Sequence, residues 1–216
     1  MQIERFIDHT LLKPTATPKA IRQLCTEAKD FKFYAVCVNS CYVPLVAEEL
    51  KGTGIKIASV IGFPLGAMSS EAKLYEAEYA IKHGADEIDM VINLGLLKSG
   101  EYELVKEEIS KIKHGIGPRV LKVIIETCYL TTEEKKTASK LVLEAKADYV
   151  KTSTGFGTGG ATFKDIELIK NVVQNRIRIK ASGGIKDLIS AERYIDMGVS
   201  RLGTSSGIKL VQESKQ

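Results

Sequence analysis

Two lysines and one aspartate stand in short apolar runs of this 216-residue chain: Asp89 in EIDMVIN, Lys151 in DYVKTS and Lys180 in IRIKAS. Two neighbouring ammonium groups repel each other, so one of them loses its proton near neutral pH and becomes a free amine. A free amine can attack a carbonyl and form an imine. A carboxylate beside it can then move protons with its lysine partner, often through a water. These residues predict imine-forming carbonyl chemistry.

The alternation of side chains in these runs predicts that the three charged residues share one face. Successive side chains of a strand point to opposite faces, and the face covered by helices must be apolar. That apolar set comprises Ile88, Met90, Ile92, Val150, Thr152, Ile177, Ile179 and Ala181. Asp89, Lys151 and Lys180 take the opposite face. In an alternative interpretation, Asp89 forms a structural ion pair with one lysine while the other reaches solvent. The alternation does not decide which lysine is the nucleophile.

Eight short, β-branched apolar runs recur along the chain, namely FIDHT, AVCV, IKIASVI, EIDMVIN, VLKVIIE, DYVKTS, IRIKAS and RLGTS. Helical periodicity lies between them, over residues 17–31, 70–83, 101–115, 132–146 and 163–175. This alternation predicts an α/β protein with a single (β/α)8 barrel domain over residues 1–216. An open doubly wound sheet is the alternative, which is weakened because no GxGxxG opens the first helix. Barrel enzymes keep their active sites at the C-terminal ends of the strands, where the charged residues lie.

Local signals mark some of the helix ends. Thr17 before Pro18 is typical of an N-cap, and Thr162 with Asp165 resembles a capping box. The helix over 70–83 is expected to end at His83, whose side chain suits the negative end of the helix dipole. These signals support the alternation of strands and helices.

The composition excludes several classes of protein. The 31 Lys and Arg against 27 Asp and Glu give a net charge of +4 without a basic run, so nucleic acid is not an expected partner. No apolar run is long enough to span a bilayer, and charges interrupt the first ten residues, so we expect a cytoplasmic protein. The four cysteines form no CxxC pair and the three histidines are widely separated, so we expect no metal and no other cofactor.

Glycine-rich segments follow the last three predicted strands. STGFGTGG follows Lys151, SGGI follows Lys180, and GTSSG follows the eighth strand, and a helix is expected to begin soon after each. Glycines let the backbone approach an anion closely, and barrels frequently bind phosphate with the loops after strands seven and eight. Together with the inward lysines, these loops favour a phosphorylated substrate.

Several motifs are similar to those of the deoxyribose-phosphate aldolases. They are IDHTLLKPTAT, VCVNSCYVP, VIGFPLGA, DEIDMVIN, LKVIIET, VKTSTGFGTGGAT, IKASGGIK and GTSSG, and they extend from about Ile7 to Ser206. The resemblance implies a (β/α)8 barrel that reversibly cleaves 2-deoxy-D-ribose 5-phosphate to D-glyceraldehyde 3-phosphate and acetaldehyde. It also implies a class I, Schiff-base mechanism without a cofactor, and a homodimer.

The resemblance also implies roles for particular residues. Lys151 would form the Schiff base, Lys180 would lower the pKa of Lys151 and take part in proton transfer, and Asp89 would relay protons through a bound water. The residues expected to hold the phosphate are Gly155, Gly183, Gly184, Ser205 and Ser206. Asp8, Thr10 and Cys37 are expected to line the pocket, although a buried core thiol is the alternative interpretation of Cys37.

Two positions depart from the pattern of the family. Phe156 stands where some members carry a lysine beside the phosphate, so Lys186 in the next loop is expected to compensate. The chain ends in ESKQ, without the terminal tyrosine that assists proton transfer in certain members. A water-mediated relay would have to serve instead.

Two other functions remain open from the sequence. A barrel isomerase or epimerase would use Asp89 as a base and form no covalent intermediate. A non-catalytic sensor would keep the sugar-phosphate pocket without cleaving its ligand.

Overall fold

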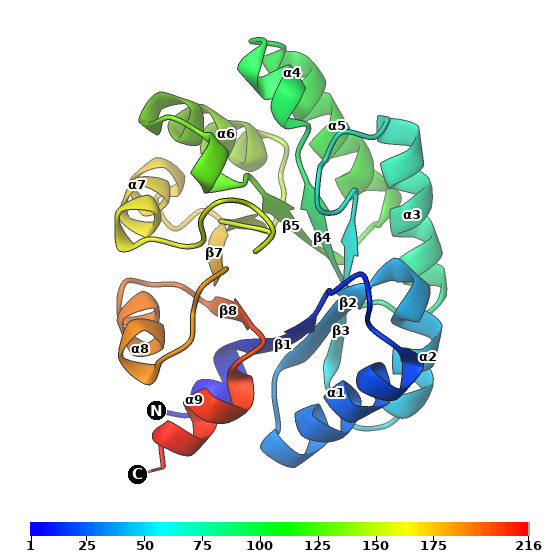
Figure 1. Ribbon diagram of the computed structural model, residues 1–216. Helices are drawn as coiled ribbons and strands as arrows, with labels where there is room; N and C mark the ends of the chain where they lie inside the picture. Colours follow the sequence, from blue (N-terminus) through cyan, green and yellow to red (C-terminus); the bar gives the residue numbers. More distant parts are fainter. Residues whose placement is uncertain (216) are drawn as a thin grey trace.

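The computed structural model describes residues 1–215, in which eight parallel strands close into a barrel in the order β1 to β8 (Figure 1). Gln216, the last residue of the predicted domain and of the ESKQ segment, lies outside the described residues. The strands are β1 Ile7–Leu11, β2 Ala35–Asn39, β3 Lys56–Ile61, β4 Glu87–Val91, β5 Val120–Ile124, β6 Tyr149–Lys151, β7 Arg178–Ser182 and β8 Arg201–Thr204. Because β1 pairs with β8, the predicted barrel is confirmed and the open-sheet alternative is wrong.

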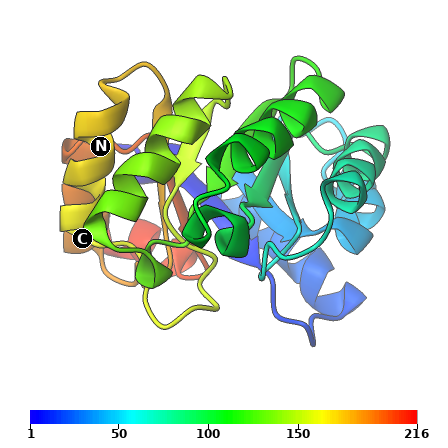
Figure 2. The ribbon, with the colours of Figure 1, turned by 90° about the horizontal axis from the view of Figure 1, so that it is seen from above.

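Helices surround the barrel and connect successive strands (Figures 1 and 2). They are α1 Pro18–Phe31, α2 Val43–Glu49, α3 Ser70–Lys82, α4 Leu94–Lys98, α5 Tyr102–Gly115, α6 Thr132–Glu144, α7 Phe163–Val173, α8 Leu188–Asp196 and α9 Gly207–Glu213. Short 3-10 turns are η1 Ile3–Phe6, η2 Ser40–Tyr42 and η3 Thr127–Tyr129. Figure 2 shows the loops after β1 and β6 projecting from the same end of the barrel, as parallel strands require.

The caps explain where several helices begin. The Thr17 hydroxyl accepts a hydrogen bond from the Ala20 N–H, with Pro18 in the first turn of α1. The Thr162 hydroxyl likewise accepts from the Asp165 N–H, but the Asp165 carboxylate pairs with Lys135 at 2.6 Å and does not complete the predicted capping box. A reciprocal box instead begins α6. The helix predicted over 70–83 ends at Lys82, with His83 as its C-cap.

Apolar side chains fill the space between the strands and the helices. Members of the set predicted to face the helices, among them Ile88, Met90, Val150, Ile179 and Ala181, lie in this core. A second, small apolar cluster comprises Leu12, Cys37, Ala58 and Val60. Within residues 1–215, every helix is too short or too polar to span a bilayer.

Candidate active site

A network of paired charges occupies the interior of the barrel. The Asp89 carboxylate on β4 accepts hydrogen bonds at 2.7 Å from the amines of Lys122 on β5, Lys151 on β6 and Lys180 on β7. None of these side chains is more than 3% exposed. The structure therefore brings together the three residues that the alternation placed on one face, and both predicted lysines contact Asp89 directly.

Further charges lie beside this cluster. Lys122 also contacts Glu87 at 2.6 Å. Arg201 on β8 contacts Glu87 at 3.0 Å and Asp8 on β1 at 2.7 Å. The Lys180 amine donates a short hydrogen bond to Asp8. We call the closed circuit of alternating charges the charge ring; its members are Asp8, Glu87, Asp89, Lys122, Lys180 and Arg201. Lys151 is attached to this ring through Asp89.

Strand register aligns the members of the charge ring. Asp89 is level with Lys122 across the β4–β5 pair, and Lys180 is level with both Lys151 and Arg201 across its two neighbouring strands. Gly203 on β8 leaves the space that the Lys180 side chain occupies. A Cβ at Gly203 would lie 3.1 Å from the Lys180 Cε atom, closer than an ordinary van der Waals contact.

The two predicted lysines differ in ionisation. Burial lowers the pKa of Lys151, and repulsion from Lys180 lowers it further, against the attraction of Asp89. Burial acts on Lys180 in the same direction, but Asp8 and Asp89 outweigh it and raise the pKa of Lys180. Of the two lysines, Lys151 therefore gives up its proton more readily, whereas Lys180 stays an ammonium.

Two acids of the charge ring, Asp8 and Asp89, stay ionised. Burial alone would raise the pKa of Asp89, but the three surrounding lysines hold it well below its usual range. Burial also opposes ionisation of Asp8, yet Lys180 and Arg201 lower its pKa to about 2. The pKa of Arg201 is raised, because Asp8 and Glu87 overcome the effect of burial.

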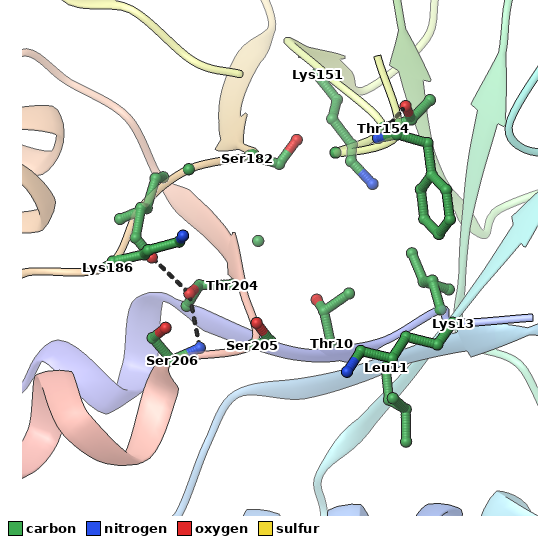
Figure 3. A pocket seen from close by; sticks show the side chains of 17 residues that line it. Thr10, Leu11, Lys13, Lys151, Thr154, Ser182, Lys186, Thr204, Ser205 and Ser206 are labelled. Atoms are coloured by element: carbon green, nitrogen blue, oxygen red, sulfur yellow. Dashed lines mark hydrogen bonds between the residues drawn. The ribbon is translucent and has the colours of Figure 1, made fainter. Parts of the chain in front are cut away.

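A cavity of about 390 Å³ opens above the network at the C-terminal ends of β1, β6, β7 and β8 (Figure 3). Lys151 lines it, whereas Lys122 and Lys180 lie beneath it with 0% exposure. Its walls include the residues expected at the phosphate, namely Gly155, Gly183, Gly184, Ser205 and Ser206. Thr10 also lines the cavity. Asp8 lies lower, in the charge ring, and Cys37 is fully buried in the small apolar cluster.

The walls of the cavity suit an anion. Among the described residues, Lys13, Lys151 and Lys186 line it and no acidic side chain does. Lys151 and Lys186 point into it from different sides (Figure 3). The backbone of the glycine-rich loops lines the cavity directly at Gly155, Gly183 and Gly184. These glycines adopt positive φ angles of 84°, 85° and 79°, which residues with a Cβ rarely take.

Other cavity residues have partners within the protein. The Ser206 N–H donates to the Thr204 hydroxyl at 2.9 Å, so this N–H is already hydrogen-bonded within the protein. The Ser206 hydroxyl is therefore better placed than its N–H to contact a ligand. Phe156 is half exposed and packs edge-on against Phe63, with ring centroids 5.3 Å apart. The phenyl ring of Phe156 gives this side of the cavity an apolar wall.

Sequence reasoning missed Lys122, Arg201 and the pairing of Glu87. The same alternation could have found Lys122, because Leu121 and Val123 on either side of it belong to the core that faces the helices. Leu202 likewise faces the helices, which turns Arg201 inward. Glu87 lies two residues before Asp89 on β4, so the same alternation turns it inward, but alternation does not reveal its partners.

Comparison with known proteins identifies the family. Residues 5–208 match the family model described as "DeoC/LacD family aldolase". The chain belongs to this aldolase family. It is 53% identical to "Deoxyribose-phosphate aldolase" of Coprothermobacter proteolyticus over 99% of this chain and 97% of that protein. The resemblance found in the motifs is therefore confirmed, and the chain is a carbon–carbon lyase.

Solved structures of aldolases share the fold. The protein named "QR15, an Aldolase" superposes with a TM-score of 0.95 at 42% identity, over 99% of this chain and 96% of that chain. A deoxyribose phosphate aldolase from Aeropyrum pernix, described as tetrameric, superposes with a TM-score of 0.91 at 34% identity. That match covers 99% of this chain and 91% of the other.

Proposed function

We propose that this aldolase reversibly cleaves 2-deoxy-D-ribose 5-phosphate to D-glyceraldehyde 3-phosphate and acetaldehyde through a Schiff base on Lys151. The observation that carries the proposal is the position of Lys151. Its amine has a lowered pKa and lines the cavity, while the other two lysines that contact Asp89 lie beneath the cavity. An accessible, uncharged amine is what attack on an aldehyde requires.

The reaction begins when the Lys151 amine attacks C1 of the open-chain sugar; the Asp89–Lys180 pair supplies one proton, and water leaves to give a protonated imine. The C3 hydroxyl then loses its proton, and the C2–C3 bond breaks as its electron pair moves to the iminium. D-glyceraldehyde 3-phosphate leaves, and an enamine stays on Lys151. The enamine takes up a proton at C2, and water hydrolyses the resulting imine to release acetaldehyde and the free amine.

Asp89 and Lys180 are the proposed proton-transfer partners. Asp89 contacts the amines of both Lys151 and Lys180 at 2.7 Å, so a proton can pass along this path without a large movement. The raised pKa of Lys180 keeps it an ammonium, which can donate a proton and disfavours a second charge on Lys151. The bound water expected beside Asp89 stays part of this proposal.

The phosphate is proposed to lie between the glycine-rich loops after β6, β7 and β8. Their backbone approaches the cavity at Gly155, Gly183 and Gly184, and Ser205 and Ser206 add polar groups. Lys186 and Lys13 supply positive charge, in place of the charge that Phe156 lacks.

Reductive trapping tests the proposed mechanism. Incubation with acetaldehyde and cyanoborohydride should increase the mass of the peptide that contains Lys151, and Lys151→Leu should abolish both the label and cleavage. A label on Lys180 instead would make Lys180 the nucleophile. Isomerisation or epimerisation of the sugar phosphate without any label on the protein would refute the Schiff base. It would favour an isomerase or epimerase with Asp89 as its base. Binding of the sugar phosphate without turnover would indicate a sensor.

Two further properties have simple measurements. Retro-aldol turnover is expected to be unchanged by a chelator, since each proposed step uses only side chains of this chain and water. The expected homodimer is tested by the solution mass, for which the tetramer described for the Aeropyrum pernix relative is the competing outcome.

A further inference from the structure

The charge ring alternates in sign at every step. Arg201 lies between Asp8 and Glu87, at 2.7 and 3.0 Å. Lys122 lies between Glu87 and Asp89, at 2.6 and 2.7 Å. Lys180 contacts Asp89 at 2.7 Å and closes the circuit through its short contact with Asp8. The ring therefore contains three acids and three bases, whose formal charges cancel without Lys151.

Lys151 is the cation in excess of this balance. Its carboxylate contact within residues 1–215 is Asp89, which already accepts hydrogen bonds from Lys122 and Lys180. When Lys151 gains a proton, the cluster carries a net positive charge. None of the residues in this cluster is more than 3% exposed. An unbalanced buried charge is costly, whereas alternating pairs offset much of their desolvation.

We propose that the charge ring keeps Lys151 unprotonated by its own neutrality, and that Glu87, Lys122 and Arg201 are positioning residues for imine formation. The proposal rests on the proposed function, in which Lys151 is the nucleophile. Glu87, Lys122 and Arg201 do not line the cavity, so they act on the amine through the ring and do not touch substrate. The ring thereby extends the active site to side chains of β4, β5 and β8 that do not line the cavity.

The other groups that face the ring do not supply a compensating charge. Burial raises the pKa of Cys37 on β2, so it stays a thiol, and β3 contributes apolar Ala58 and Val60. The Tyr149 hydroxyl on β6 lies 3.5 Å from Arg201. The Tyr34 ring packs 3.6 Å below the Arg201 guanidinium, and Arg178 packs 4.3 Å over the Tyr149 ring.

Charge-altering variants test the proposal through the pH dependence of labelling at Lys151 by acetaldehyde and cyanoborohydride. Lys122→Met leaves the ring with one excess negative charge, which favours a proton on Lys151. The rise of labelling rate with pH should then move to higher pH by roughly one to three units. Glu87→Gln leaves one excess positive charge and should move the rise to lower pH, by less because Glu87 does not contact Lys151. The double variant Lys122→Met/Glu87→Gln restores neutrality and should return the rise towards that of the unaltered protein.

Lys73→Met is the matched control. Lys73 is also fully buried and pairs with Glu108 at 2.8 Å, outside the barrel interior. This variant should lower the unfolding temperature without moving the pH dependence of labelling. A general packing effect would lower labelling equally at all pH values and would make the double variant worse than either single one.

Two results would overturn the inference. One is an unshifted pH dependence in folded Lys122→Met, and the other is a double variant no closer to the unaltered protein than its parents. If Lys122→Met does not fold, the opposite shift of Glu87→Gln and its reversal in the double variant carry the test. Failure to label Lys151 in the unaltered protein would instead refute the proposed function, so the two failures are distinguishable.

Discussion

Two regions of this protein each bury a lysine, and they differ in what surrounds it. Lys151 in the barrel interior and Lys73 on α3 are both at most 3% exposed, and burial lowers the pKa of both. Each contacts a carboxylate, at 2.7 Å for Lys151 with Asp89 and 2.8 Å for Lys73 with Glu108. By burial, pKa direction and partner distance, the two lysines are alike.

The difference lies in charge balance and access. Lys73 forms a one-to-one pair with Glu108 and donates a second hydrogen bond to the Val91 carbonyl, between α3, α5 and β4. Lys151 shares Asp89 with two other lysines and lines the cavity. A lowered pKa alone therefore does not identify a nucleophile. What distinguishes the proposed nucleophile is that it is an excess cation beside an open cavity, where it can lose its proton and reach a substrate.

The largest expected difference between the two regions is in activity. Lys151→Met should lower kcat/KM for retro-aldol cleavage on the order of 10⁴-fold or more, since the covalent route is lost. Lys73→Met should change kcat/KM by less than roughly threefold, because Lys73 does not line the cavity. A coupled aldehyde assay measures both. Equal losses in the two variants would contradict the comparison.

Stability should show the reverse order. Lys73→Met leaves the Glu108 carboxylate buried without its cation and should lower the free energy of unfolding by roughly 3–5 kcal/mol. Adding Glu108→Leu should recover most of this loss. Lys151→Met removes only the excess cation and should cost about 1 kcal/mol or less, since Asp89 keeps Lys122 and Lys180. Urea unfolding measures all three variants, and a larger cost for Lys151→Met would count against a self-neutral charge ring.

Acid should weaken the charge ring in a defined pH range. The pKa of Asp8 is about 2 in the folded protein against an ordinary value of 3.8, so its ionised form favours folding. This contribution, roughly 2 kcal/mol, is fully present above the unfolded value and is lost as pH falls through the folded value. Urea unfolding from pH 5 down to about pH 2 measures it. The double variant Lys73→Met/Glu108→Leu should keep this pH dependence, whereas Asp8→Asn should reduce its slope; a dependence unchanged by Asp8→Asn would place the acid sensitivity elsewhere.

The smallest effect is expected for an exposed lysine at the mouth of the cavity. Lys186→Gln should raise KM for the phosphorylated sugar by roughly twofold to tenfold, because a solvated charge is partly screened. Added salt should weaken the unaltered protein more than the variant. Labelling of Lys151 by acetaldehyde, which has no phosphate, should be unaffected. A parallel loss of labelling would mean that Lys186 acts on the amine and not on the phosphate.

Local sequence patterns were sufficient for the fold and for part of the site. Apolar and polar residues alternate along a strand wherever one face is buried. The pattern around Asp89, Lys151 and Lys180 therefore predicted that these residues share a face. All of the predicted strands formed, and caps such as Thr17 were visible because a cap depends on residues three apart. Helices α2 and α4 were missed, since seven and five residues are too few to display a helical period.

What the tertiary structure decided depends on residues far apart in the chain. Asp8 and Arg201, which contact each other at 2.7 Å, are 193 residues apart, and their meeting requires the barrel to close between β1 and β8. Sequence patterns placed Lys151 and Lys180 on one face but could not rank them. Strand register placed Lys180 between two carboxylates and left Lys151 one shared carboxylate and an opening to the cavity. That ranking is an electrostatic property of the assembled ring, because each lysine takes its ionisation from neighbours contributed by other strands.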